Sequence, residues 1–175
     1  MALRRFCSLA ALAAGLLGAS VSPGFSAKDS TVTTSGLPVP RYVSLKSDHV
    51  NVRAGPTKDN DVAWVYTRSG LPVEITAEFE NWRRVRDSEG AEGWVYHSLL
   101  SGRRTAVITM KTKEELASLY DRADAASEVV ARLQAGVVAL VKTCAARWCR
   151  VTGTGFDGWI EQQRLWGVYA DEKLE

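Results

Sequence analysis

Two stretches of the chain carry the same pattern of residues. Residues 70–102 read GLPVEITAEFENWRRVRDSEGAEGWVYHSLLSG, and residues 136–167 read GVVALVKTCAARWCRVTGTGFDGWIEQQRLWG. Matching residues recur 66 positions later, and 65 positions later after one deletion: Gly70 with Gly136, Trp82 with Trp148, Val85 with Val151, Gly93-Trp94-Val95 with Gly158-Trp159-Ile160, and Leu100 with Leu165. An internal repeat of this kind indicates two copies of one small structural unit.

The repeated unit is expected to consist of short β-strands joined by tight turns. In residues 72–79, PVEITAEF, apolar and polar side chains alternate, which is the pattern of a half-buried strand. Residues 112–133 are rich in helix formers and, taken alone, fit an amphipathic helix. Their counterpart at 50–66, VNVRAGPTKDNDVAWVY, contains Gly55-Pro56 and alternating apolar residues, which is typical of strand, turn and strand. We therefore predict an all-β protein with about five short strands in each unit, and a short helical turn around Lys113 to Leu116 is the alternative left open there.

The first residues differ from the rest of the chain. Arg4 and Arg5 precede an uncharged run over residues 6–25, and small residues follow, as in a secretory signal peptide. The strongly apolar part is short for a transmembrane helix, which needs ~20 apolar residues. We expect a signal peptide at 1–27, a periplasmic or secreted protein, and no membrane span after cleavage. An uncleaved membrane anchor is the competing interpretation.

The segment after the expected signal peptide differs in composition from the repeated units. Residues 28–40, KDSTVTTSGLPVP, are rich in Ser, Thr, Pro and Gly, and they predict a flexible linker. We place the first unit at 41–104, the second at 105–170 and a tail at 171–175. Units of ~60 residues are small for an independent core, so we expect the two units to pack together.

The charge of the chain argues against nucleic-acid binding. The full sequence has 22 Lys plus Arg against 20 Asp plus Glu. The expected signal peptide removes Arg4 and Arg5 and no acidic residue, so the remaining chain is formally neutral. A nucleic-acid binder usually carries a basic surplus or a basic stripe. We therefore expect no nucleic-acid partner.

Two of the three cysteines lie outside the expected signal peptide, at Cys144 and Cys149. Two thiols in an exported protein favour a structural disulfide. A structural zinc site usually takes four ligands, whereas only His49 and His97 are available, both in the other unit. A redox centre usually has Cys-x-x-Cys spacing. We expect the disulfide and no metal or cofactor, with a metal or redox role as the less supported alternatives.

In the alignment of the two units, Cys144 and Cys149 take the places of Glu78 and Arg83. Both pairs flank the turn between two adjacent strands, where antiparallel partners bring Cα atoms ~4.5–5.5 Å apart, within reach of a disulfide. The disulfide is expected to contribute roughly 2 kcal/mol by closing a small loop. In the first unit we expect an exposed ion pair worth less than ~1 kcal/mol.

On these motifs the chain resembles tandem bacterial SH3-like (SH3b) domains over about residues 41–170. The resemblance is carried by VNVRAGP, by the Trp-x-x-Val strands, and by EGWVYHSLLSG and DGWIEQQRLWG. It implies a small five-stranded barrel in each unit, closed by a single helical turn before the last strand. The second unit departs from the pattern, because Asp121-Arg122-Ala123 stands where the first unit has Ala54-Gly55-Pro56. The resemblance also implies that these modules bind cell-wall peptides or protein partners rather than catalyse.

The sequence shows no catalytic constellation. It has no Gly-x-Ser-x-Gly motif, and oxidised cysteines offer no thiolate nucleophile. His49 and His97 are isolated and fit exposed loop histidines. No spacing singles out a pair among the many carboxylates. We therefore expect that the protein is not an enzyme and has no catalytic residues.

The aromatic side chains are the better indication of function. Six Trp and five Tyr exceed what the cores of two small barrels need. Trp82 lies an odd number of residues from Val85, so if Val85 faces the core, Trp82 faces out. The resemblance implies that Trp82 and Tyr96 line a ligand groove, with Trp148 as the counterpart in the second unit. For each of them the alternative is packing in a core or between the units.

These observations together predict a non-catalytic periplasmic binding module that recognises peptidoglycan or its stem peptides. The alternative is an envelope adaptor that binds a protein partner through the SH3-like groove or through the face between the two domains.

Overall fold

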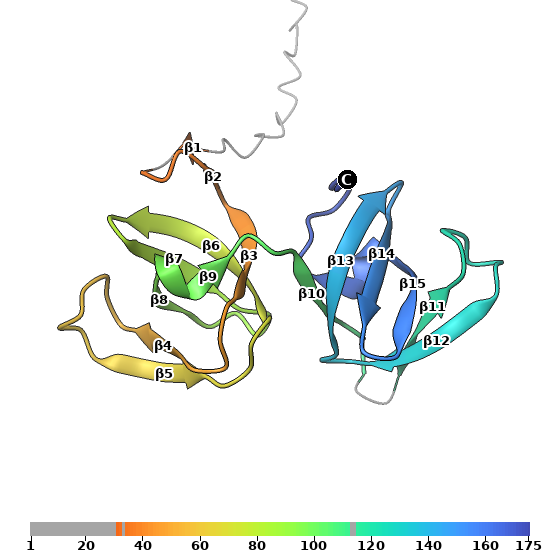
Figure 1. The fold of residues 1–175 in the computed structure, drawn as a ribbon, viewed down its shortest axis with the longest axis horizontal. Helices are drawn as coiled ribbons and strands as arrows, with labels where there is room; N and C mark the ends of the chain where they lie inside the picture. The colour runs from red at the N-terminus through yellow and green to blue at the C-terminus, as the bar shows by residue number, and fades with distance from the viewer. Residues whose placement is uncertain (1–30, 33, 113–114) are drawn as a thin grey trace, which may run out of the picture.

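The structure is a computed structural model that describes residues 31–32, 34–112 and 115–175. The expected signal peptide at 1–27 lies outside the described residues. Two β-domains lie side by side, one formed by β3 to β9 and the other by β10 to β16 (Figure 1). Within the described part of the chain, no helix is long and apolar enough to cross a membrane.

The first domain is a seven-stranded antiparallel sheet with the order β5-β4-β8-β7-β6-β3-β9. Its strands are β3 (Arg41–Leu45), β4 (Val50–Arg53), β5 (Val62–Tyr66), β6 (Pro72–Phe79), β7 (Trp82–Arg86), β8 (Glu92–Tyr96) and β9 (Leu100–Ser101). A 3-10 turn, η1 (His97–Leu99), precedes the last strand. The sheet has seven strands rather than about five, because β3 and β9 add two strands at the edge beyond β6.

The second domain repeats this topology strand by strand, with the order β12-β11-β15-β14-β13-β10-β16. Its strands are β10 (Thr105–Ile108), β11 (Leu116–Tyr120), β12 (Val129–Gln134), β13 (Val138–Ala145), β14 (Trp148–Gly153), β15 (Phe156–Glu161) and β16 (Leu165–Trp166). The turn η2 (Gln162–Arg164) corresponds to η1. The prediction of two tandem all-β units is confirmed, and the described residues 115–133 contain the strands β11 and most of β12 and no helix, whereas residues 113–114 lie outside the described part of the chain.

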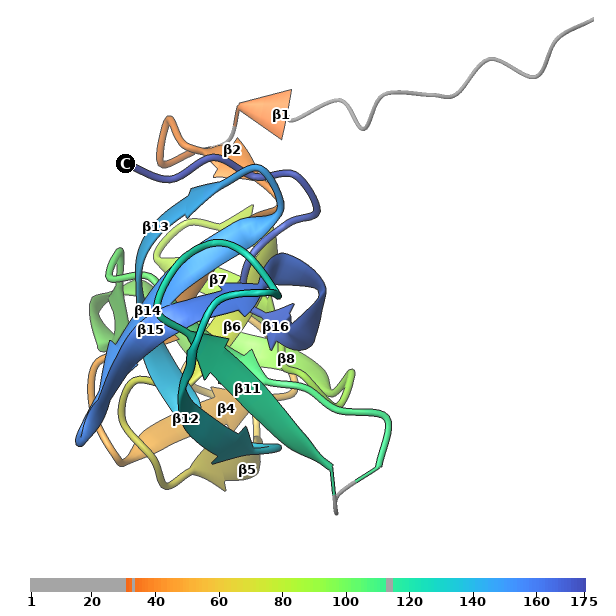
Figure 2. The same cartoon turned by 90° about the vertical axis from the view of Figure 1, so that its right-hand side faces the viewer.

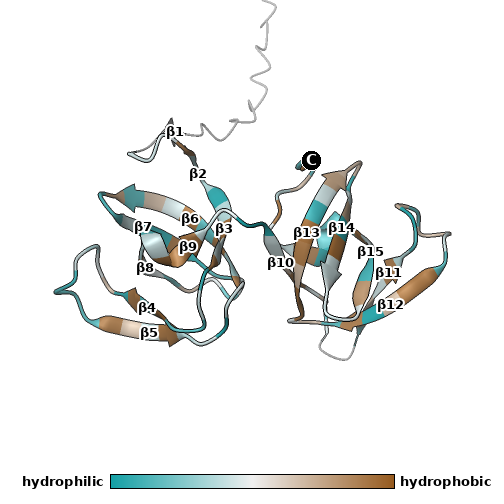
Figure 3. Ribbon diagram, viewed as in Figure 1, coloured by the Kyte–Doolittle hydropathy of each residue, from teal (hydrophilic) through white to brown (hydrophobic). Residues whose placement is uncertain are grey.

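Each domain encloses its own hydrophobic core. The first core includes Val52 and Val85, and the second includes Leu119 and Val151, each fully buried. Hydrophobic and hydrophilic residues alternate along strands of both sheets, as β13 shows (Figure 3). This alternation places one side of each strand in a core and leaves the other side for surface contacts.

The Gly-Trp pair that marks each repeat has a steric cause. A Cβ on Gly93 would lie 2.4 Å from the Cγ1 of Val52. A Cβ on Gly158 would lie 2.9 Å from the Cγ2 of Val130. Only glycine allows β8 and β15 to approach the neighbouring hairpin this closely, and the repeated glycine therefore belongs to the fold rather than to a ligand site.

Part of the segment expected to be a flexible linker is packed against the first domain. The strand β1 (Thr31–Val32) pairs with β2 (Pro38–Val39). Val39 is buried in the first core, and Ser35 donates hydrogen bonds from its amide and its hydroxyl to the carboxylate of Glu78. Residues 28–30 and 33 lie outside the described residues.

The ion pair expected between Glu78 and Arg83 is present, but the prediction that it is exposed is wrong. Arg83 Nε lies 3.1 Å from Glu78 Oε1, and the exposed fractions of the two side chains are 10% and 0%. Arg41 adds a second guanidinium, with Nη2 2.6 Å from the same oxygen. The sequence analysis did not predict the burial of Glu78, because the residues that reach it, such as Ser35, lie in the segment that was predicted to be a flexible linker.

Aromatic side chains join the two domains. The ring of Tyr42 meets the ring of Trp166 edge-on at 5.2 Å and lies 4.7 Å from the ring of Tyr169. The Tyr169 hydroxyl donates a 2.9 Å hydrogen bond to Oε1 of Glu74, which is buried in the first domain. The phenol of Tyr169 thus ties the C-terminal segment to the opposite domain.

A second set of contacts fixes the C-terminal segment on the side of the second domain. The guanidinium of Arg104 makes two hydrogen bonds to Glu172, of 2.8 and 3.0 Å, and a third to the carbonyl of Gly167. The backbone of Leu174 makes two hydrogen bonds with the backbone of Cys144. The C-terminal segment thereby forms one antiparallel bridge to β13. In two perpendicular views this segment lies at the same end of the molecule as β1 and β2 (Figure 2).

Candidate ligand-binding sites

The first candidate site is a groove on the outer face of the first domain. Trp82 opens β7 and lies directly opposite Tyr96 on β8, and the two rings meet edge-on at 5.4 Å. Val85 on the same strand is fully buried in the hydrophobic cluster of the first domain, and Trp82, although buried, does not belong to that cluster. The alternation along β7 therefore directs Trp82 to the outer side. Only 8% of Trp82 is exposed, so Tyr96 offers the larger accessible surface.

The groove combines aromatic walls with cationic residues. It has a volume of about 210 Å³ and is lined by Asn51, Arg53, Lys58, Trp82, Tyr96 and Leu99. Arg53 is held in place, because its Nη1 donates a 2.6 Å hydrogen bond to the carbonyl of Asn60. Lys58 is exposed. Almost all of the accessible lining is apolar, which suits apolar groups and sugar or peptide planes, while Arg53 and Lys58 bring positive charge that attracts carboxylates to its surroundings.

The second domain does not reproduce this groove. Tyr120 takes the place of Arg53, because each pairs with the Trp of the Gly-Trp motif in its own domain. Tyr120 meets the ring of Trp148 edge-on at 5.6 Å. Glu161 lies opposite Trp148 on β15, where the first domain has a tyrosine opposite its tryptophan. On the outer face of the second domain, the aromatic Tyr120 thus stands in place of the cationic Arg53. The carboxylate of Glu161 stands in place of the aromatic ring of Tyr96.

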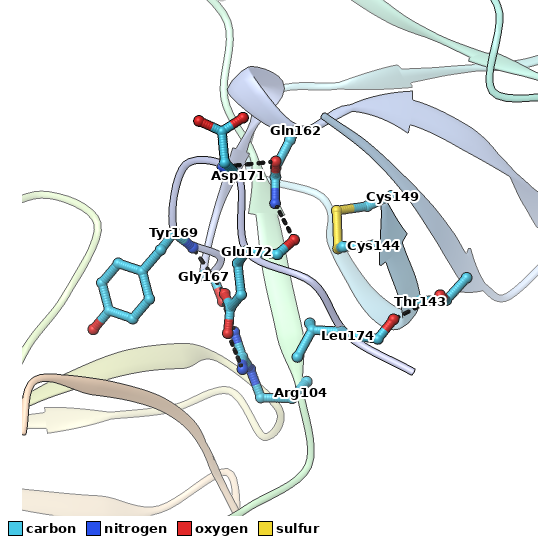
Figure 4. Close-up of a disulfide and its surroundings, with 10 residues drawn as sticks. All are labelled: Arg104, Thr143, Cys144, Cys149, Gln162, Gly167, Tyr169, Asp171, Glu172 and Leu174. Atoms are coloured by element: carbon cyan, nitrogen blue, oxygen red, sulfur yellow. Dashed lines mark hydrogen bonds and ion pairs between the residues drawn. A yellow bond between two sulfur atoms is a disulfide. The ribbon is translucent and has the colours of Figure 1, made fainter. Parts of the chain in front are cut away.

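The disulfide between Cys144 and Cys149 is present, as predicted (Figure 4). The two residues lie directly opposite each other on β13 and β14, with their Cα atoms 4.1 Å apart. Their exposed fractions are 2% and 0%, so the bond lies in the core. It spans the turn formed by Ala146 and Arg147.

A pocket of about 520 Å³ lies beside this turn. The turn, η2 and the C-terminal segment form it, and its lining residues are Ala146, Arg147, Trp148, Glu161, Gln162, Gln163, Leu165, Val168, Ala170 and Asp171. Gln162 is buried and holds two of these segments together: its Nε2 donates to the carbonyl of Glu172, and its Oε1 accepts from the amide of Asp171 (Figure 4). Trp148, expected in a groove like that of Trp82, lines this different pocket.

The ionisable groups with shifted pKa values are concentrated at the contact between the domains. Burial raises the pKa of Tyr42 to about 12, and the nearby Glu74 charge adds to the shift. Burial and the Glu74 charge likewise raise the pKa of Tyr169. Burial alone would raise the pKa of Glu172, but hydrogen bonds from Arg104 and from the Tyr169 amide outweigh it, so that pKa is lowered. These shifts follow from packing between the domains and not from a reaction centre.

In the described residues, no group of three or more His, Cys, Asp or Glu side chains is placed to hold a metal ion. His49 lies in the loop before β4, and His97 begins η1. The ring of His97 packs 5.0 Å from that of Tyr96, at the edge of the first groove.

The sequence analysis singled out Trp82 and Tyr96, and the structure brings these two together. It missed Arg53 and Lys58, because their place in the groove depends on the conformation of the β4–β5 hairpin. Arg147 and Asp171 were also missed, since they lie 24 positions apart in the sequence. The only sequence signal for Tyr120 was its alignment with Arg53 in the internal repeat.

A family model described as "Bacterial SH3 domain" matches residues 46–102 and again residues 113–167. The two matches together cover more than half of the chain, and the chain belongs to the bacterial SH3 domain family. None of the curated proteins compared with the chain matches it.

Two solved structures from Trichomonas vaginalis are similar in part. NlpC2 shares 15% sequence identity with a TM-score of 0.32, over 73% of this chain and 48% of that one. NlpC1 shares 16% identity with a TM-score of 0.32, over 82% of this chain and 51% of that one. The chain therefore spans about half the length of each of these two proteins.

Proposed function

We propose that this protein is a non-catalytic binding module of the bacterial cell envelope that recognises peptidoglycan, or its stem peptides, through the groove at Trp82 and Tyr96. The observation that carries the proposal is the combination of two aromatic rings in edge contact with Arg53 and Lys58 in one groove. Stem peptides are extended chains that carry free carboxylates and small apolar side chains. Such a chain matches both the aromatic walls and the cations.

Membership in the bacterial SH3 domain family supports a binding role, because these domains are typically non-catalytic binding modules. The buried disulfide supports a location outside the cytoplasm, since disulfides persist in oxidising compartments such as the periplasm. A periplasmic or secreted protein would meet the cell wall directly.

The direct test is sedimentation of the purified protein with isolated sacculi. We expect the wild-type protein to pellet with the sacculi, and Tyr96→Ala to reduce the bound fraction about tenfold, as expected for the loss of a central aromatic contact. Lys58→Gln should reduce binding less and should weaken its dependence on salt. Lys142→Gln is the matched control, because Lys142 is also exposed, on β13 of the second domain, and lines neither this groove nor the cleft between the domains.

Tyr96→Ala is preferred to Trp82→Ala because Trp82 is nearly buried and its loss risks unfolding. Circular dichroism should show that each variant keeps the wild-type spectrum. Equal pelleting of wild-type, Tyr96→Ala and Lys142→Gln proteins would exclude the groove as the binding site.

The alternative function is an envelope adaptor that docks a protein partner on the face between the domains. A cleft of about 400 Å³ favours it, because residues of both domains line the cleft and its charged members are Lys46 and Arg103. Crosslinking in cells from position 154, which is exposed and lines the same cleft, should then capture one saturable partner, and the capture should be lost in Arg103→Glu. A protein that pellets with sacculi and gives no such crosslink would rule the adaptor out.

A further inference from the structure

The pocket beside the disulfide lies on the second domain, apart from the groove at Trp82. Its volume of about 520 Å³ falls within the range of small-ligand sites, ~300–1,000 Å³. Three separate segments of the chain build it: the turn between β13 and β14, the turn η2, and residues 168–171. The first domain has no counterpart of the third segment, because after β9 its chain continues into β10 instead of folding back.

The backbone around the pocket is held in an unfavourable conformation. Ala146, Arg147 and Asp171 have φ values of 49°, 67° and 60°. They are three of the four described residues other than glycine with positive φ, a conformation that L-residues rarely adopt. A two-residue hairpin of this kind usually has Asn-Gly. Strained backbone of this sort gathers at ligand sites, where the surrounding structure enforces it.

The disulfide is the feature that holds this turn. Cys144 and Cys149 enclose Ala146 and Arg147, and the bridge from Leu174 fixes the outer edge of the same hairpin. The equivalent turn in the first domain, next to Glu78 and Arg83, has an ion pair in place of the covalent bond. The disulfide of the second domain therefore constrains the hairpin turn that forms one wall of the pocket.

The charged side chains of the pocket have opposite signs and do not neutralise each other. Within the described residues, the guanidinium of Arg147 and the carboxylate of Asp171 make no ion pair and no side-chain hydrogen bond. Glu161 accepts a 2.7 Å hydrogen bond from Gln163, and Arg164 approaches it only to 3.8 Å. Among the described residues, one unpaired cation and one unpaired carboxylate, together with the already partnered carboxylate of Glu161, thus lie around one pocket.

The remaining wall of the pocket is apolar. Trp148 is half-buried, with one side against Tyr120, and the buried residues Leu165 and Val168 lie beneath. A ligand that fits this lining carries a positive charge, a negative charge and a small apolar group within a few ångströms.

We propose that this pocket binds a zwitterionic amino acid or the corresponding end of a short peptide, with Arg147 contacting the carboxylate and Glu161 with Asp171 contacting the ammonium group. The planar guanidinium suits paired hydrogen bonds to a carboxylate, and an ammonium donates to carboxylates in any direction. Trp148 and Val168 contact the aliphatic side chain. This site is distinct from the groove at Trp82 and does not depend on the function proposed for it.

The test is an NMR titration of the ¹⁵N-labelled protein with three probes: the dipeptide Ala-Ala, its N-acetylated form, and its C-terminal amide. We expect Ala-Ala to shift the amide signals of Arg147, Gln163 and Asp171 with a dissociation constant of about 1 mM. Blocking either end should weaken binding about tenfold, since each charged hydrogen-bonded pair contributes on the order of 1.5 kcal/mol.

Two variants assign the contacts. Arg147→Asn keeps a residue that tolerates positive φ, and it should weaken Ala-Ala and N-acetyl-Ala-Ala while leaving the amide form unchanged. Asp171→Asn should have the reverse pattern, weakening Ala-Ala and the amide form. Arg122→Gln and Asp121→Asn are the controls, because both residues are strongly exposed on the same domain and outside the pocket.

The proposal is overturned if Ala-Ala causes no saturable shift at these amides, or if the blocked forms bind as well as the free dipeptide. It is also overturned if both pocket variants bind all three probes like the wild type. These outcomes leave the groove untouched, and pelleting with sacculi that depends on Tyr96 is measured separately. Failure of one proposal is therefore distinguishable from failure of the other.

Discussion

Glu78 shows how burial changes the energy of a single ion pair. Its carboxylate is fully covered and lies within 3.1 Å of Arg83 and 2.6 Å of Arg41. In water such a pair contributes less than ~1 kcal/mol. Away from water, removing one partner leaves an uncompensated charge, which costs ~3–5 kcal/mol. The exposure of the pair therefore decides whether it matters for stability.

We expect Glu78→Gln to lower the free energy of unfolding by about 3 kcal/mol, because two guanidinium groups lose their shared carboxylate. Urea unfolding followed by tryptophan fluorescence measures the change. Glu92→Gln is the matched control: its ion pair with Arg84 is partly exposed on both sides, and we expect a loss below ~1 kcal/mol. Equal losses in the two variants would contradict this account of burial.

Trp82 shows that the direction of a side chain and its exposure are separate properties. Spacing along β7 directs it away from the core that contains Val85, as the alternation of a strand requires. Packing against Tyr96 on the neighbouring strand still covers most of it. A sequence pattern fixes the first property, and only the fold fixes the second.

At the scale of elements, the hairpins β6–β7 and β13–β14 are the same structure stabilised in two ways. In both, the second residue pair from the turn carries the link, as Glu78 opposite Arg83 and Cys144 opposite Cys149. Each hairpin is also covered by a chain terminus, the first by residues 34–39 and the second by Leu174. Both copies of the repeat thus have a link between the two strands at the same position. The link is an ion pair in the first domain and a disulfide in the second.

We expect replacement of both cysteines by alanine to lower the free energy of unfolding by about 2 kcal/mol, from the loss of a small closed loop. Thermal unfolding with and without dithiothreitol measures this. The reductant should lower the melting temperature of the wild-type protein and have no effect on the double variant. A melting temperature unchanged by the double replacement would show that the hairpin does not need the link.

At the scale of the whole molecule, the two domains are joined by a polar and aromatic contact and not by one shared core. The hydrophobic cores are separate, and between them lie Tyr42, Trp166, Tyr169 and the pair of Arg104 with Glu172. Two further hydrogen bonds cross the contact, from Thr105 to Gly70 and from Arg68 to Gly136. The C-terminal segment contributes two of the linking side chains, so the domain arrangement depends on residues beyond the repeats.

The Glu172 carboxylate makes this contact sensitive to acid. Its pKa is lowered from the ordinary value of 4.5, so its contribution to stability is present above that pH and is lost as the pH falls through the lower, folded-state pKa. We expect Glu172→Gln to lose about 1 kcal/mol of stability at neutral pH. The difference from wild type should shrink below about pH 4.

Urea unfolding at several pH values measures this difference. Glu89→Gln serves as the control, because Glu89 is exposed and lies away from the contact between the domains. A gap between wild type and Glu172→Gln that stays constant down to acidic pH would contradict the role assigned to this carboxylate.

The repeat, the strand pattern and the disulfide were readable from the sequence because they rest on local periodicity and on paired positions. The alignment of 112–133 with 50–66 predicted strands against the local helix propensity, and the structure has strands at β11 and β12. The packing of residues 34–39 was not predictable in this way, because Val39 is buried by contacts with residues far along the chain.

The two repeated units, most of their strand segments and the disulfide followed from the amino-acid sequence by itself, since alternating apolar residues, turn glycines and the repeated Gly-Trp pair act over short distances. The tertiary structure alone decided the burial of Glu78, the grouping of Arg53 and Lys58 with Tyr96, and the pocket between Arg147 and Asp171. These features depend on which segments meet in space, and side-chain burial and electrostatic environment are set only when they meet.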